Sequence, residues 1–565
     1  QNGSYIHAAE DYMEEQQFIP KSEISQSIKD LILAEVPNSE IIDFEVEFSR
    51  INVSGNDNKI FFAVIENNQS ESFEVVINGD GERVIIVMPF EDIIPGIGAS
   101  GAANDIDTAA TTLVLSDSAT GDIFVTETDG VAIGATTTTA GQISLSSGGA
   151  VTTSGDITAA GGALSISGVD LTNTNTITGG SNGLTLDAGT GTLTSTAGNI
   201  TNGGSAGSIT LAADTDVVLG GGAGAITSGS GNVILKDSSG SVSIGVEGGA
   251  GTISLADSDL DEITTSGAII IGDASSGAIT IGGAIQPSGS EALKFSGNSV
   301  ALNANVTTAN ADITFVPAVT VGAGVTIDSG AGAGDIIFSG TLDGGQTVVL
   351  DAGSGGINFN GVVGATALTS LATTGTTGSI SIGQNVTTTG VQTYTGPVTL
   401  SGSPTLATTD SLVTFSGDVS GAGALTVTSG TGGLTFGSTI GAGVNVTSLS
   451  TTGTTGNITL SGDIDSDGTL TFNGPVLLAA DVTITTSDDL VTFSGTLDNA
   501  QNFVVTTGSG GITFTEIVGG TTPLTSLLTT GTTGTITLGG NVNTSGNQNY
   551  VGPVLFDSDI ALNVT

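Results

Sequence analysis

The chain has 565 residues, including 89 glycines, and its 55 acidic residues against 7 basic ones give a net charge of −48. This charge excludes a nucleic-acid partner, because phosphate binding requires clustered lysine and arginine. Cysteine is absent, which excludes disulfides and thiol chemistry. No apolar run of about 18 residues occurs, so we expect no membrane span. Valine, isoleucine and leucine alternate with threonine and serine, which is typical of β-strands and not of a disordered chain.

The first hundred residues differ in composition from the rest of the chain. They contain five of the seven basic residues, both methionines and the single histidine, His7. A lone histidine with no second histidine or cysteine nearby is expected to be solvated, and metal ligation is the alternative. We divide this part into a polar arm at 1–19, a small domain at 20–95, and a linker or first coil at 96–119.

The small domain is expected to combine a helix with an antiparallel sheet. Ser22 can cap a helix with apolar residues at helical spacing, and Pro37 stops it. Apolar alternation and short apolar runs then predict four strands, at 42–48, 60–65, 73–77 and 84–88. The last two are joined by an Asn-Gly-Asp-Gly turn. The sequence therefore predicts one helix on a four-stranded antiparallel sheet, an α+β domain.

Two segments of this domain resemble a known family. Val-Pro-Asn-Ser-Glu-Ile-Ile-Asp-Phe-Glu at 36–45 and Val-Ile-Asn-Gly-Asp-Gly-Glu-Arg-Val at 76–84 are similar to the PepSY-like family. The resemblance covers roughly residues 20–90. It implies a small periplasmic or extracellular binding or inhibitory module, and therefore an exported protein without catalysis in this domain.

Between residues 120 and 335 an apolar-polar-apolar triplet recurs after glycine-rich turns. Steps of 20 to 25 residues with short strands predict coils of a parallel β-solenoid, with apolar residues in the bore and Thr and Ser outside. About 465 residues would give about 19–23 coils. The triplets begin at Ile143, Leu164, Leu184, Ile209, Val233 and Ile253, followed more closely by Ile269 and Ile279.

Residues 336–565 contain three repeats of 78 residues. Their clearest marker is Thr-Thr-Gly-Thr-Thr-Gly, at 373–378, 451–456 and 529–534. A fixed period of this kind indicates a repeat architecture. Tandem β-sandwich domains are the alternative fold, but the chain lacks tryptophan and the strand spacing at 120–335 is too short for them.

The solenoid part also resembles a known family. Gly-Ser-Val-Ser-Ile-Gly-Val-Glu-Gly-Gly-Ala-Gly-Thr-Ile-Ser-Leu at 240–255 and the Ile/Thr/Gly-rich segment at 263–283 are similar to the repeats of filamentous-haemagglutinin-like bacterial exoproteins. The 78-residue units resemble the β-strand repeats of such large surface proteins. Over residues 120–565 the resemblance implies a right-handed parallel β-helix on a bacterial cell surface.

One acidic turn is a candidate calcium site. Asp463, Asp465 and Asp467 alternate before Gly468, like the start of a calcium loop that collects hard oxygen ligands. The equivalent turns at 385–390 and 541–546 lack the three aspartates, so a solvated acidic turn is the alternative. A second acidic cluster comprises Asp257, Asp259, Asp261 and Glu262.

Catalysis is not expected. Beyond residue 100 the only cations are Lys236 and Lys294, whereas carboxylate-pair sites that cleave polysaccharides gather acids with cations in a groove. Aromatic residues recur once per repeat, and we expect them to pack in the core or at corners, with a ligand-binding stripe as the alternative. These residues are Phe359, Phe436, Phe514, Tyr394, Phe472 and Tyr550.

The sequence therefore favours a non-enzymatic structural protein of the bacterial cell surface that self-associates into a filament, sheath or surface layer. The alternative is an adhesin in which the solenoid is a stalk presenting a module that binds a cell-surface glycan. A first residue Gln1 suggests a secreted chain whose signal peptide has been removed. The sequence stops before a fourth 78-residue unit, so we expect either a continuing chain or a last coil that docks another subunit.

Overall fold

The computed structural model describes residues 15–18, 39–48, 60–67, 72–78, 86–89, 106–108, 112–114, 116–117 and 122–565, the last range without 139–140, 204–205 and 223. From residue 112 to 564 the chain forms a parallel β-solenoid of about 21 turns with almost no helix. This confirms the predicted solenoid and its number of coils. The alternative of tandem sandwiches is wrong, because each strand pairs in parallel with strands of adjacent turns.

The chain divides into two compact units. Unit 1 comprises residues 1–244 and 251–272, and unit 2 comprises residues 245–250 and 273–565.

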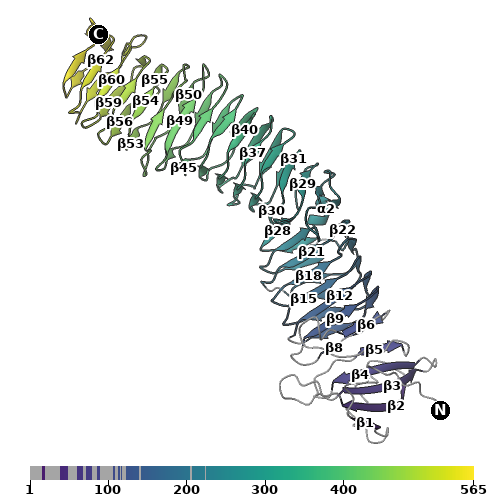
Figure 1. Cartoon of the computed structure of the whole chain (residues 1–565). Coiled ribbons are helices and arrows are strands. Elements are labelled where there is room, and N and C mark those ends of the chain that lie inside the picture. Colours follow the sequence, from purple (N-terminus) through teal and green to yellow (C-terminus); the bar gives the residue numbers. More distant parts are fainter. Residues whose placement is uncertain are drawn as a thin grey trace. The chain divides into compact units, whose positions relative to one another are not determined.

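The N-terminal part of unit 1 contains a five-stranded antiparallel sheet whose strands follow one another in chain order (Figure 1). The sequence predicts four of its strands and misses the first, which lies in the expected arm and pairs with the second strand. The helix expected after Ser22 and the residue His7 lie outside the described residues. The strands are β1 (Glu15–Phe18), β2 (Ser39–Phe48), β3 (Ile60–Asn67), β4 (Ser72–Asn78) and β5 (Ile86–Pro89).

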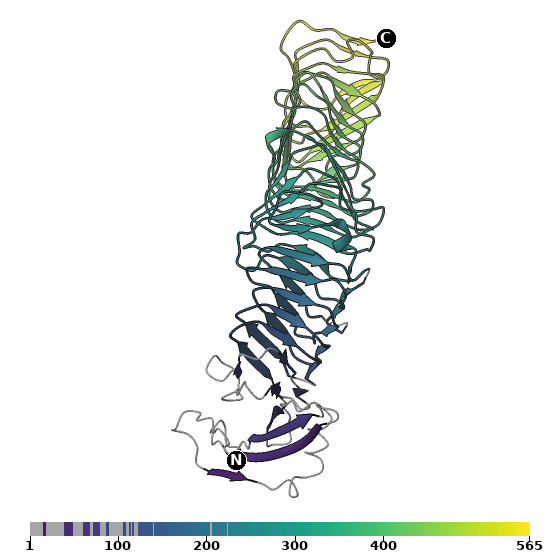
Figure 2. The same cartoon turned by 90° about the vertical axis from the view of Figure 1, so that its right-hand side faces the viewer.

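In the solenoid of unit 1, each regular turn adds one short strand to each of three parallel sheets (Figure 2). The predicted triplets stack directly on one another, so that Ile143 pairs with Leu164 and Leu164 with Leu184. This sheet contains β9 (Ile123–Glu127), β12 (Ile143–Ser147), β15 (Leu164–Ser167), β18 (Leu184–Asp187), β21 (Ile209–Ala212), β24 (Val233–Lys236) and β28 (Ala268–Ile271).

The predicted column of triplets is wrong beyond β24. Val233 pairs with Ile269 and not with Ile253, which lies in β26 (Ile253–Leu255) of another sheet. Ile279 lies in β29 (Ala278–Ile281) and pairs with Val300. The error has a physical origin: strands of all three sheets share the same apolar-polar-apolar pattern, so spacing alone does not assign a strand to its sheet.

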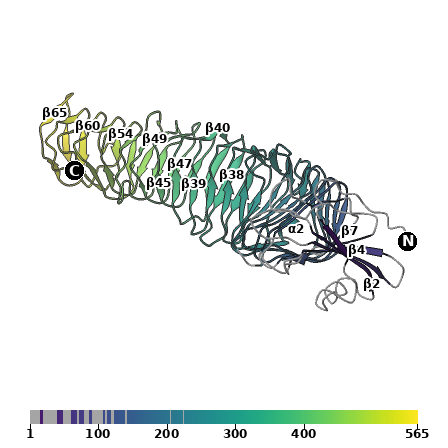
Figure 3. The ribbon, with the colours of Figure 1, turned by 60° about the horizontal axis from the view of Figure 1, so that its bottom comes forward.

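Unit 2 also has three parallel sheets, which we call faces 1, 2 and 3 in the order in which the chain visits them (Figures 1 and 3). Face 1 includes β33 (Ile313–Phe315), β36 (Ile336–Phe338), β39 (Ile357–Phe359), β42 (Ile380–Ile382), β45 (Val398–Leu400) and, after single bridging residues, β53 (Ile464–Ser466). Face 2 includes β54 (Leu470–Phe472), β57 (Val491–Phe493), β60 (Ile512–Phe514), β62 (Ile536–Leu538) and β65 (Val554–Phe556). Face 3 includes β35 (Val325–Asp328), β38 (Thr347–Asp351), β44 (Gln392–Tyr394), β47 (Val413–Phe415), β50 (Leu434–Phe436), β52 (Ile458–Leu460) and β55 (Val476–Leu478).

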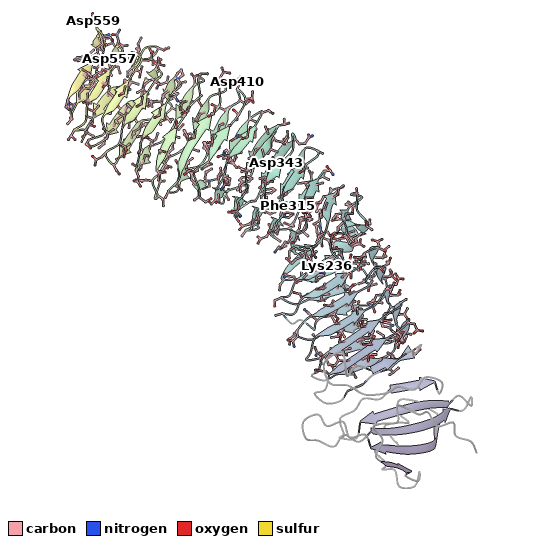
Figure 4. All side chains as sticks on the ribbon, in the orientation of Figure 1. Lys236, Phe315, Asp343, Asp410, Asp557 and Asp559 are labelled. Atoms are coloured by element: carbon pink, nitrogen blue, oxygen red, sulfur yellow. The ribbon has the colours of Figure 1, made fainter. Side chains whose placement is uncertain are left out.

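Most strands of unit 2 have three residues, of which the first and third are buried and the middle one points outward. This follows from the period of two along a β-strand. Valine, isoleucine, leucine and phenylalanine fill the bore, as predicted. Figure 4 shows Phe315 within the stack and the exposed Asp410 at its edge.

The 78-residue repeat does not correspond to a whole number of turns. The equivalent residues Phe338, Phe415 and Phe493 lie on faces 1, 3 and 2, respectively. Eleven strand positions separate each from the next, counting the bridging residue Ile440, and three positions make one turn. One repeat therefore spans three and two-thirds turns, and every repeated feature moves to another face.

The aromatic residues form interior stacks that change face with the repeat. On face 1 the rings of Phe315 and Phe338 stack with centroids 5.2 Å apart. The corresponding stacks are Tyr394, Phe415 and Phe436 on face 3, and Phe472, Phe493 and Phe514 on face 2. All of these side chains are buried, which confirms the predicted core packing and makes the alternative of a ligand-binding stripe wrong for them. Tyr550, in the penultimate turn, is partly exposed.

Candidate functional site

The predicted calcium turn lies in and beside β53. Ile464 and Ser466 are buried, so Asp463, Asp465 and Asp467 point outward from the strand. Asp463 Oδ1 accepts a 2.7 Å hydrogen bond from the backbone N–H of Thr483, one turn further along the chain. Asp467 Oδ1 accepts a 2.8 Å hydrogen bond from Asn445 Nδ2. Two of the three carboxylates, those of Asp463 and Asp467, therefore have separate partners in the protein.

The equivalent turns show that the bond made by Asp463 does not need a charge. Asn385 Oδ1 accepts from the N–H of Thr405 at 2.9 Å, and Asn541 Oδ1 accepts from the N–H of Ala561 at 2.8 Å. Among the described residues, no group of three His, Cys, Asp or Glu side chains could hold a metal ion. The calcium site at Asp463, Asp465 and Asp467 stays a prediction, and the structure shows these residues at alternate positions on the outward side of one strand.

The same capping bond recurs along both units. An Asp or Asn just before a strand accepts the backbone N–H of the residue that occupies the same place in the next turn. Such a bond satisfies a backbone donor at a corner, where the parallel ladder begins. The sequence signal for it is an Asp or Asn directly before an apolar-polar-apolar triplet. Further examples are Asp122 with Gln142, Asp156 with Thr176, Asp170 with Thr192, Asp335 with Gly356 and Asp481 with Asn502. Asp410 and Asp488 lie three residues before their strands and accept from Thr431 and Ser509 in the next turn in the same way.

Hydrogen bonds lower the pKa of two capping carboxyls, that of Asp481 and that of Asp418, which precedes β48 (Val419–Ser420) and accepts the backbone N–H of Thr439. The Ser438 and Thr439 hydroxyls donate to Asp418 and, in that order, hold its pKa below the ordinary value. The Asn502 side chain, followed by the Asn502 backbone N–H, lowers the pKa of Asp481. Both shifts favour the ionised form, as expected for a carboxylate that accepts hydrogen bonds.

Carboxylates of the second acidic cluster also accept hydrogen bonds from backbone N–H groups. Asp257 and Asp259 lie in the one-turn helix α2 (Asp257–Leu260). Asp259 Oδ2 accepts a 2.7 Å hydrogen bond from the N–H of Ala256 at the start of this helix. Glu262 is buried and its Oε2 accepts from the N–H of Gly221 at 3.0 Å. Two members of the cluster therefore act as backbone acceptors.

The Thr-Thr-Gly-Thr-Thr-Gly marker of the repeat forms a corner in which the first and fourth residues are buried. Its fourth residue, Thr376, Thr454 or Thr532, is almost fully buried in each copy. The hydroxyl of Thr376 accepts from the N–H of Ala352 at 3.0 Å, and that of Thr454 accepts from the N–H of Ser429 at 3.2 Å. The fourth residue therefore binds the corner of the preceding turn, whereas the second, third and fifth residues of the marker are exposed.

A cavity of about 390 Å³ lies beside β35 and β38. Asp328 and Asp351 line it, together with glycines and small residues. Each carboxylate already accepts a hydrogen bond from a nearby backbone N–H, that of Gly330 at 2.7 Å and that of Gly353 at 3.0 Å. These two acids therefore close local turns.

The outward-facing residues of unit 2 are the remaining candidate for function. On face 3, the middle residues of β44, β47, β50 and β52 are Thr393, Thr414, Thr435 and Thr459, which are neighbours in the parallel register. Their side chains are partly exposed. The next residue in this column is Leu477 of β55. We call these five residues the face 3 strip.

The described helices include none that is long and apolar enough to cross a membrane. Comparison of the chain with protein-family models, with curated proteins and with solved structures found no match.

Proposed function

We propose that this chain is a non-enzymatic structural protein of the bacterial cell surface, which assembles through its solenoid into an extracellular filament, sheath or surface layer. In keeping with the two family resemblances, we also propose that the solenoid is right-handed and that the N-terminal part is an α+β domain.

The observation that carries this proposal is the rotation of the 78-residue repeat around the solenoid. A partner lying along one face would meet a given repeated feature again only after three repeats. Neighbours on several sides meet related surfaces, because each repeat places its outward residues on a different face. In a lattice, neighbouring chains would contact these related surfaces on several faces, whereas a single bound molecule would contact one face.

The hydrogen bonds that the carboxylates accept from adjacent turns support the same proposal. Those that cap the next turn stabilise the solenoid, and the outward threonines form flat ladders with the regular spacing of a β-sheet. The net charge of −48 keeps dilute chains apart and soluble, so assembly would require concentration or screening by salt.

Electron microscopy of the purified full chain tests the proposal. The chain is examined over a range of protein and salt concentrations. Ordered filaments, tubes or sheets are the expected result. Isolated single molecules at every concentration would overturn the proposal.

An adhesin remains the second candidate, and a specific observation favours it. The sheet formed by β1 to β5 is antiparallel and separate in sequence from the parallel solenoid, as a presented binding module would be. A glycan and cell-binding screen with the full-length chain tests this function. Tight binding by a monomeric chain would favour the adhesin over the structural polymer.

A further inference from the structure

The face 3 strip has a second copy on face 2. Each of its residues recurs 78 positions later, as Thr471, Thr492, Thr513, Thr537 and Leu555. These five are also neighbours in a parallel ladder. We call them the face 2 strip. Because one repeat spans three and two-thirds turns, the two strips occupy different faces of unit 2.

The residues of both strips are uncharged, although the chain has a net charge of −48 and carboxylates lie beside the strips, with Asp410 before β47 and Asp488 before β57. The strands of the face 3 strip read QTY, VTF, LTF, ITL and VLL, and those of the face 2 strip read LTF, VTF, ITF, ITL and VLF. Like-charged chains repel each other wherever their carboxylates meet. Two copies can therefore approach most closely where the surface is neutral.

Exposed apolar residues border both strips. Val391 and Leu412 precede β44 and β47 and are 47% and 39% exposed, and the N–H of Gln392 donates to the carbonyl of Leu412 across the two turns. Leu490, the repeat equivalent of Leu412, is 40% exposed beside the face 2 strip. Burial of such side chains against a partner would be favourable, at about 25 cal/mol for each Å² removed from water.

Face 1 offers a natural comparison. Its equivalent strands carry Thr314, Ile337, Asn358, Ser381 and Thr399 as middle residues. Asp312 and Asp335 directly precede the first two of these strands. Like the two strips, this face has carboxylates along its edge, but it has a threonine only at each end of the column instead of a run of four.

The spacing of the strips indicates the kind of partner. Parallel strands repeat about every 4.8 Å along a ladder. A partner stays in register over five rungs only if it has the same spacing, which a second parallel solenoid does. The sheets of two such molecules can pack face to face at about 10 Å, with threonine and leucine side chains between them.

We propose that a second copy of this chain docks on each of the two strips, the face 3 strip against the same strip of one neighbour and the face 2 strip against the same strip of another. A contact of this kind relates two copies by a two-fold axis. Since each chain has two such faces, a dimer formed through one strip still presents the other strip, and further chains can add. This inference rests on the proposed structural function and names the surfaces through which the chains assemble.

A matched set of single substitutions tests the proposal. Thr435 and Thr513 are equivalent positions in the two strips, and Asn358 is their equivalent on face 1. Thr435→Asp and Thr513→Asp each place a carboxylate in the middle of one strip. Asn358→Asp introduces the same charge on face 1 and serves as the control. An outward strand position accepts this side chain, as Asp465 in β53 demonstrates.

Sedimentation velocity and mass photometry of the full-length variants provide the readout, with circular dichroism and thermal unfolding as checks of the fold. Wild type and Asn358→Asp are expected to grow into long assemblies. Each single-strip variant retains one unaltered strip, and its assembly is expected to end at the dimer. The double variant Thr435→Asp/Thr513→Asp is expected to remain monomeric.

The outcomes separate this inference from the function on which it rests. If wild type polymerises and the folded double variant polymerises equally well, the strips are not the interface, and the structural function stands. If the control is impaired as strongly as the strip variants, the loss comes from added charge in general, which also overturns the inference. A wild-type chain that stays monomeric at every concentration and salt level overturns the proposed function itself.

Discussion

Tyr394 donates a 3.0 Å hydrogen bond from its hydroxyl to Oε1 of Gln392, two residues earlier on the same strand, and both side chains are fully buried. Gln392 Nε2 in turn donates to the carbonyl of Ala407 at 2.9 Å. Burial raises the pKa of the Tyr394 hydroxyl far above its ordinary value, so the group stays protonated and acts as a donor. The second repeat replaces this polar pair with Leu470 and Phe472.

This natural exchange predicts a compensating double substitution. Gln392→Leu alone leaves the Tyr394 hydroxyl without its acceptor and should lower the free energy of unfolding by about 1–3 kcal/mol. Gln392→Leu with Tyr394→Phe recreates the pair found at 470 and 472 and should recover most of that loss. Urea unfolding of both variants checks this. A double variant as unstable as the single one would contradict the compensation.

The inter-turn cap made by Asp463 predicts that an amide can replace the carboxylate. Asp463→Asn should keep the stability of wild type, because Asn385 and Asn541 make the equivalent bond. Asp463→Ala should lose about 1 kcal/mol, since the N–H of Thr483 then lacks its acceptor. Unfolding midpoints in the presence and absence of calcium measure both effects. A stabilisation by calcium that Asp463→Asn abolishes would argue against the cap as the role of this residue.

Asp418 should make stability depend on pH. Hydrogen bonds from Ser438 and Thr439 lower its folded-state pKa below the ordinary value of 3.8. The ionised carboxylate therefore stabilises the fold above this value, and the contribution is lost as the pH falls through the lowered folded-state pKa. The difference in unfolding free energy between wild type and Asp418→Asn should shrink from pH 7 to pH 2. A difference that stays constant over this range would contradict the prediction.

The aromatic stack on face 3 predicts that the loss of stability on replacing a ring depends on the size of the side chain that replaces it. Phe415 lies between Tyr394 and Phe436, with ring centroids 5.2 and 5.1 Å away. Phe415→Ala should cost about 3–5 kcal/mol because it leaves a cavity. Phe415→Leu should cost less, since Leu460 and Leu478 fill the same column in later turns. Thermal unfolding of the two variants gives the comparison, and equal losses would show that the column does not accept leucine here.

Much of the solenoid follows from local patterns in the sequence. The column from Ile143 to Val233 is predictable because each step adds one turn of nearly constant length. The prediction fails at Ile253, where extra residues that include α2 separate β24 from β28, because the strands of different sheets look alike in sequence. Assigning them requires knowledge of which strands pair.

The candidate site was harder to predict. Carboxylates at alternate positions satisfy the pattern of a calcium loop, but in a strand this alternation puts Asp463, Asp465 and Asp467 side by side on one surface. Comparison with Asn385 and Asn541 in the sequence already argues against a need for charge. The capping role becomes visible only when Asp463 and Thr483, twenty residues apart, are seen to lie in adjacent turns.

The fractional number of turns in the repeat has a consequence for how such a chain can change length. The three faces of unit 2 are built from similar short strands, so a gain or loss of one 78-residue copy leaves an unbroken ladder. Each strand that follows the added copy, however, moves to a neighbouring face of the solenoid. Chains that differ by one copy would thus expose their distal neutral strips in different directions, and only chains that differ by three copies would align again. The number of repeats would then determine which length variants can assemble into the same lattice.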